Sequence, residues 1–288
     1  MIAADPFEVV RSVALKHSLP VMPRTASVIC LLLSALLACA ESHLPGGRAA
    51  NGHRTNSIEG WTVLVNVRLL ADDNAATAKA LELLRAQLQE IVRVVPAPAV
   101  EKLRAVTLWF SPEYPGVKPK AEYHPGVGWL REHGRDPAMV KGIEFTDVRN
   151  FEAEARRMPN FTLHELAHAY HDRILERGFA NAEVKTAYER AKAGKTYDNV
   201  ERWFGNGRSN TFERAYAMVD PMEYFAETTE ALFSRNDFFP FNRAELKQHD
   251  PEMEQLLARL WGVTEQVSRK ERKDTQKEEH ERSNLPIM

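Results

Sequence analysis

The sequence predicts an α+β protein, with a small mixed sheet ahead of a central helix and a mostly helical C-terminal half. Two observations indicate this class. Segments with strand character, rich in β-branched and aromatic residues, concentrate before residue 150. Apolar residues at helical spacing dominate after residue 160. The chain has 288 residues, and we interpret residues 58–262 as a single domain.

Composition excludes several classes of protein and of site. The net charge of −2 gives no basic surface for nucleic acid, so we expect no nucleic-acid partner. Both cysteines, Cys30 and Cys39, lie in one apolar segment ahead of the predicted domain. A disulfide framework or a cysteine zinc site is therefore excluded in the domain itself. Any metal there must be held by His, Asp or Glu.

The first 40 residues have the pattern of an export signal. Ala26–Ala38 is apolar, follows Arg24 and ends in small residues, and it is too short to span a bilayer. A start at Met22 would give an ordinary signal, so we interpret Met1–Val21 as a mis-assigned start or an extended n-region. The tetrapeptide ending in Cys39 is similar to a bacterial lipobox, which makes a lipid anchor there the one membrane contact we expect. A buried N-terminal helix is the alternative. We expect a secreted or cell-envelope location, in the bacterial periplasm or on the outer surface.

The elements of the first half follow from composition and spacing. Glu41–Ser57 is rich in Gly, Asn, Ser and charged residues and is interpreted as a linker. Ala75–Val94 carries leucines at helical spacing and predicts an amphipathic helix that ends at the following prolines. We expect strands at Trp61–Leu70, Arg104–Phe110, Ala121–Leu130 and Lys141–Asp147.

The second half is predicted to be mainly helical. Asn150 is expected to cap a short helix, and Gly205-Asn206-Gly207 indicates a hairpin turn within Val200–Ala217. Further helices are predicted at Ala182–Ala193, Asp220–Ser234 and Asp250–Gly262. Charges of both signs alternate through residues 263–288, which we interpret as a disordered tail.

The segment Phe161–Asp172, FTLHELAHAYHD, carries the motif H-E-x-x-H. Its apolar residues fall at helical spacing: Leu163, Leu166, Ala167 and Tyr170. On a helix, His164 and His168 share one face and can bind one Zn²⁺, while Glu165 can take a proton from a water beside it. His171 is too close in sequence to ligate without strain, so we expect it behind the ligands, in the cleft or on the surface. An amphipathic helix with surface histidines is the alternative.

A catalytic zinc needs a third protein ligand and one open position. The metzincin pattern places a His where Ile174 stands, so that class is excluded. Glu223 and Glu227 in MEYFAETTE lie one helical turn apart. Glu223 can ligate zinc while Glu227 accepts a hydrogen bond from the outer nitrogen of a ligand His, and the reverse assignment stays open. A capping box with Asp220 is the alternative for Glu223.

Together, HELAH and EYFAE resemble the gluzincins, zinc peptidases in which Glu is the third ligand. The nearest resemblance is to the anthrax lethal-factor-like family, which includes the Pro-Pro endopeptidases, and to related uncharacterised secreted bacterial proteins. It implies a zincin-like domain with one Zn²⁺ per chain, held by His164, His168 and Glu223. It also implies Glu165 as the base and Tyr216, seven residues before Glu223, as a donor to the transition state; Tyr224 is the rival.

We therefore expect a secreted zinc-dependent metallopeptidase. In it a zinc-activated water hydrolyses peptide bonds, with Glu165 as general base. The substrate, a peptide or protein, is expected along an edge strand of the sheet, for which Lys141–Asp147 is the candidate by its proximity to the motif. One alternative is a non-catalytic zinc-binding module of the cell envelope that retains the zincin fold. A second is a structural domain with incidental histidines.

Overall fold

The computed structural model describes residues 52–263. The predicted export signal, residues 1–40, lies outside this range, as does the charged tail from residue 264 onward. The α+β class is confirmed, with a small mixed sheet and a mostly helical second half. Within residues 52–263, no helix combines the length and the apolar character needed to cross a bilayer.

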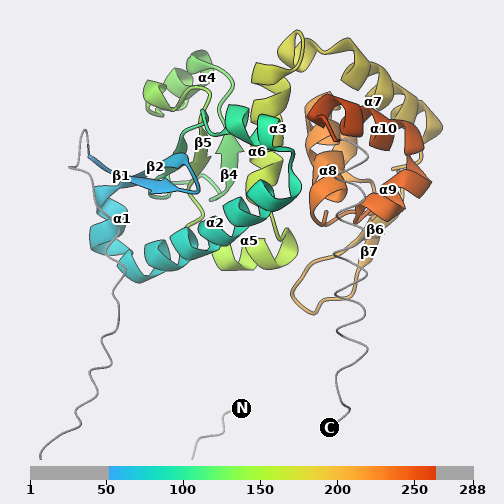
Figure 1. Cartoon of the computed structure of the whole chain (residues 1–288). Helices are drawn as coiled ribbons and strands as arrows, with labels where there is room; N and C mark the ends of the chain where they lie inside the picture. The colour runs from blue at the N-terminus through green and yellow to red at the C-terminus, as the bar shows by residue number, and fades with distance from the viewer. Residues whose placement is uncertain (1–51, 264–288) are drawn as a thin grey trace, which may run out of the picture. The chain divides into compact units, whose positions relative to one another are not determined.

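A five-stranded mixed sheet occupies the first half of the described chain, in the order β1-β2-β3-β5-β4 (Figure 1). The strands are β1 (His53–Ile58), β2 (Trp61–Asn66), β3 (Leu108–Phe110), β4 (Ala121–Tyr123) and β5 (Ile143–Phe145). Strands β2, β3 and β5 are parallel, and β1 and β4 are antiparallel to their neighbours. The two edges of the sheet are therefore β1 and β4.

Register determines which residues face the core. Val65, Phe110 and Phe145 are aligned across the three central strands and belong to the main core. Residues one position earlier point to the opposite face. There Leu64 and Trp109 pack with Leu130 and Met139 in a small second cluster.

Helices cover the sheet and form the second half. They are α1 (Val67–Asp72), α2 (Asn74–Val94), α3 (Ala97–Leu103), α4 (Val127–Glu132), α5 (Phe151–Arg157), α6 (Phe161–Ile174), α7 (Ala182–Gly194), α8 (Pro221–Phe233), α9 (Arg243–His249) and α10 (Pro251–Trp261). A two-stranded hairpin, β6 (Val200–Arg202) and β7 (Thr211–Glu213), lies between α7 and α8 in sequence. Helix α6 packs against β4 and against α8, and Figure 1 shows it between the sheet and the C-terminal helices.

Several predicted boundaries in the first half were wrong. The last residues of the predicted linker Glu41–Ser57 form most of β1, because they pair with β2. The strand predicted at Trp61–Leu70 stops at Asn66, whose side chain accepts from the Arg68 N–H and starts α1. The strand predicted from Arg104 begins only at Leu108, because α3 continues to Leu103.

Two further strand predictions were wrong in ways that affect the site. Within Ala121–Leu130 only the first three residues form a strand, β4. Pro125 and Gly126 follow it, and Gly126 is the N-cap residue of α4. Lys141–Asp147 does contain β5, but β5 lies between β3 and β4. It is an interior strand, so it cannot be the edge that receives an extended substrate. That edge is β4.

The predicted helices of the second half are confirmed. Asp220 and Asp250 accept main-chain N–H groups at the starts of α8 and α10, and a proline follows each of them. Gly262, in the left-handed region, ends α10. The predicted hairpin at Val200–Ala217 is present as β6 and β7. Helix α9 was not predicted.

Candidate metal centre and cleft

The H-E-x-x-H helix is fixed at its start and along its apolar face. The Asn160 side chain caps α6 by accepting from the Leu163 N–H at 3.1 Å. Phe161, Leu163 and Leu166 are buried in the main core. This packing leaves the motif residues on the remaining face of α6, between α8 and β4.

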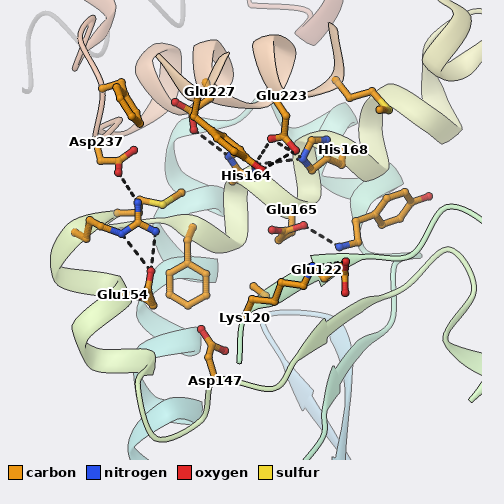
Figure 2. Close-up of a pocket in the computed structure, with 18 of the residues that line it drawn as sticks. Lys120, Glu122, Asp147, Glu154, His164, Glu165, His168, Glu223, Glu227 and Asp237 are labelled. Carbon is orange, nitrogen blue, oxygen red and sulfur yellow. Dashed lines mark hydrogen bonds and ion pairs between the residues drawn. The ribbon is translucent and has the colours of Figure 1, made fainter. Parts of the chain in front are cut away.

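Two predicted ligands from α6 and one from α8 meet at a single point (Figure 2). The Nε2 atoms of His164 and His168 are 3.2 Å apart. The Oε2 atom of Glu223 is 3.1 Å from the first and 3.4 Å from the second. The three side chains are 8%, 12% and 18% exposed, so the cluster is largely buried yet accessible from the cleft.

This donor set fits a zinc ion. Ligand atoms about 2.0–2.2 Å from a tetrahedral Zn²⁺ lie about 3.3 Å from one another, which is the separation seen here. Two imidazoles and a carboxylate are also the gluzincin ligand set that the sequence implied. Glu223 is at the third position of α8, where a capping-box Glu would turn back to Asp220. Instead its Oε2 faces the two histidines, which favours the ligand over the capping alternative.

Hydrogen bonds in this cluster shift the pKa values of His164 and Glu223 in opposite directions. Burial would lower the pKa of His164, but hydrogen bonds with Glu223 and Glu230 raise it well above its usual value. Burial would raise the pKa of Glu223, but hydrogen bonds from both histidines hold it well below its usual range. His164 and Glu223 therefore stabilise each other's charged forms.

The residue that orients His164 is Glu230, which sequence reasoning missed. The Nδ1–H of His164 donates to Glu230 Oε1 at 2.7 Å, whereas Glu227 Oε1 is 3.7 Å away. Glu230 thus has the role predicted for Glu227. Glu230 stands two helical turns after Glu223 on α8, and this heptad spacing was a signal present in the sequence.

Glu227 and Glu230 form a buried acidic pair behind the centre. One oxygen of each, Oε2, has no hydrogen-bond partner among the described residues. Burial and then the charges of Asp237 and Glu230 raise the pKa of Glu227 well above its usual value. Burial raises the pKa of Glu230 to about 7, against the opposing effect of His164. The pair therefore holds a proton at neutral pH.

Glu165 is held by the edge strand. Its Oε2 accepts from the Tyr123 N–H of β4 at 2.8 Å. The Tyr123 hydroxyl donates to Oδ2 of Asp172, on the next turns of α6, at 2.7 Å. Through these two hydrogen bonds Tyr123 holds β4 against α6 and also fixes the carboxylate of Glu165, the predicted base.

Tyr216 lies at the mouth of the centre, as the resemblance implied. Its hydroxyl donates to Glu223 Oε1 at 3.3 Å, and its side chain is half-exposed in the cleft. Burial and then the Glu223 charge raise the pKa of Tyr216 to about 12, so the hydroxyl keeps its proton at neutral pH. The rival, Tyr224, is fully buried and bonded to Asp250, away from the ligands.

His171 is not part of the centre. Its ring is fully buried between Phe179 and Phe225, and neither ring nitrogen has a partner among the described residues. Burial lowers its pKa to about 4, so it is neutral. The prediction that it supports the ligands or lines the cleft was wrong, because α8 covers this turn of α6.

These groups open into a cleft of about 550 Å³ between β4, α6 and α8. Its wall includes the stretch Lys118–Tyr123 on one side and Met222, Glu223 and Glu227 on the other. Phe161, Met158 and Asp147 lie farther along it. The arrangement combines a candidate metal centre, a carboxylate base and an open strand edge in one cavity.

Comparisons with protein-family models, with curated proteins and with solved structures find no match for this chain. The interpretation of the cleft therefore depends on its own geometry and on the residues described above.

Proposed function

We propose that the chain is a zinc-dependent peptidase of the gluzincin type with a zincin-like fold. The observation that carries this proposal is the convergence of His164, His168 and Glu223 within 3.1–3.4 Å of one another, with Glu165 beside them. Two helices and one strand are required to bring these groups together. A surface helix with incidental histidines would not hold its imidazoles against a carboxylate from another helix.

A zinc ion held there would supply a Lewis acid for the scissile carbonyl and would acidify a water. Glu165 would take the proton from the attacking water and later deliver it to the leaving amine. The protonated hydroxyl of Tyr216 would donate to the oxyanion that develops on the carbonyl oxygen. Glu230 would keep the His164 ring in the orientation that presents Nε2 to the centre.

The edge of β4 supports an extended peptide as the substrate. Lys120 and His124, which flank β4, exchange main-chain hydrogen bonds with the β5 side. In an antiparallel pair the intervening alternate residues point outward, so the main chain of Ala121 and the carbonyl of Tyr123 face the cleft, while the Tyr123 N–H is engaged by Glu165. A peptide could add to this edge as a further strand and cross the centre.

Glu165→Gln tests the proposal. The variant should keep its zinc and lose about 100-fold or more of its turnover on a mixture of unstructured peptides, since the amide cannot accept a proton. Glu152→Gln, an exposed change on α5, is the matched control and should keep full activity. Zinc content and peptide cleavage are measured together on all three proteins.

Two outcomes would contradict the proposed peptidase. A zinc-loaded Glu165→Gln protein that still cleaves peptides at the wild-type rate would exclude Glu165 as the base. Zinc bound by the wild-type chain without any peptide cleavage would favour the non-catalytic module of the cell envelope.

A further inference from the structure

Asp147 is a buried carboxylate in the cleft that the proposed chemistry does not use. It follows β5 by two residues and lines the same cavity as Glu165 and His164. Its residue is 2% exposed, and its Oδ1 has no hydrogen-bond partner among the described residues. Figure 2 shows its carboxylate directed into the cleft from the sheet side, across from α8. A buried carboxylate with an unpartnered oxygen is costly, so its presence in a cleft needs an explanation.

The charges near Asp147 do not neutralise it. Glu154 and Glu165 are the charges that act on it, and both are negative. Arg157 is engaged by Glu154 at 2.7 Å and by Asp237, and the Lys120 ammonium pairs with Glu122 at 2.5 Å. The charges that act on Asp147 are therefore acidic, and Arg157 and Lys120 already have partners.

The cavity that Asp147 lines also has apolar walls. Phe161 and Met158 line it, and both are buried in the main core. Lysine and arginine side chains bury an aliphatic stem along apolar surface and place a charged group at its tip. Apolar walls and a buried carboxylate with an unpartnered oxygen in the same cavity match that shape and charge.

We propose that Asp147 forms the specificity subsite of the cleft and selects peptides with a lysine or arginine side chain close to the scissile bond. This inference rests on the proposed peptidase function and names its substrate class. An incoming ammonium or guanidinium would pair with the Asp147 carboxylate and offset the charges of Glu154 and Glu165. Burial, and then those two charges, raise the pKa of Asp147 to about 7 in the unoccupied cleft, which agrees with a site that lacks its cation.

The test uses peptides in which one lysine is moved through successive positions, each matched by a peptide with neutral norleucine. For the zinc-loaded protein, kcat/KM at the best position should favour lysine by about tenfold or more. In Asp147→Asn the preference should fall to near one, while cleavage of the norleucine peptide changes little. Glu152→Gln removes an exposed charge from α5 and should keep the preference.

The outcomes distinguish this inference from the function on which it rests. Cleavage of both peptides by the wild-type chain without a lysine preference at any position would overturn the subsite and leave the peptidase intact. A preference that survives in Asp147→Asn would also overturn it. If no peptide is cleaved, calorimetric binding of the same pairs to the zinc-loaded Glu165→Gln protein decides the subsite. Equal affinities for lysine and norleucine peptides would then exclude it.

Discussion

At the scale of single residues, Tyr216 carries a protonated hydroxyl 3.3 Å from one oxygen of Glu223. From this position it can donate to an oxyanion but contributes no ligand atom to the centre. Tyr216→Phe should therefore lower kcat by about 100-fold, the effect of losing one such donor, while KM and zinc content change little. Steady-state kinetics and metal analysis check this. An unchanged kcat would remove Tyr216 from the chemistry.

Because folding raises the pKa of Asp147, the free energy of unfolding should depend on pH. Burial, and then the charges of Glu154 and Glu165, raise the pKa of Asp147 from an ordinary value of 3.8 to about 7 in the folded chain, while Arg157 and Lys120 are engaged elsewhere. A pKa raised by folding means that stability is lost as the pH rises from about 4 through about 7.

Asp147→Asn cannot ionise and should avoid this loss. Its free energy of unfolding, relative to wild type, should therefore be higher at about pH 8 than at about pH 5, by on the order of 1–2 kcal/mol. Urea unfolding at the two pH values, at matched metal content, measures the difference. The same difference at both pH values would show that Asp147 ionises freely in the folded chain.

Residue roles were predictable from sequence where spacing along one helix determines geometry. His164, Glu165 and His168 lie on one face of α6 because of the helical period alone. Glu230 and His171 depend on how α6 and α8 cross, which spacing does not determine. That crossing brings Glu230 to the His164 ring and Phe225 over His171.

At the scale of elements, α8 supplies both the third candidate ligand and the residue that orients His164. Glu230→Gln keeps the shape but removes the charge that the Nδ1–H faces at 2.7 Å. It should weaken zinc affinity about tenfold to a hundredfold. Glu227→Gln is the matched control, because Glu227 is 3.7 Å away, and should have a smaller effect. Competition with a chromophoric chelator gives both affinities, and a larger effect of Glu227→Gln would return the orienting role to that residue.

Helices were easier to predict than strands, for physical reasons. Helices α2, α6 and α8 carry their own periodicity, and α8 also has a visible capping residue in Asp220. Strands β3, β4 and β5 have three residues each, too few for a reliable alternating pattern. Their stability comes from neighbours far apart in sequence.

At the scale of the whole molecule, the cleft depends on sheet order, which local sequence does not contain. The interior position of β5 and the edge position of β4 follow from pairings between residues about 20 apart, with β4, and about 35 apart, with β3. This order places the open main chain of β4 beside α6, with α8 on the other side of the same helix. The α+β class and the candidate ligands could be predicted from sequence, whereas the edge position of β4 and the proposed Asp147 subsite required the assembled fold.

We expect α6 and α8 together to hold one zinc ion, and the metal content of the purified chain tests this expectation. The chain from Glu41 onward, purified in the presence of zinc, should contain about one zinc per molecule, and Glu223→Ala should lose it or bind it far more weakly. Glu152→Gln should retain it. Full zinc in Glu223→Ala would place the third ligand elsewhere. Absence of zinc from the wild-type chain would contradict both the proposed metal centre and the peptidase function.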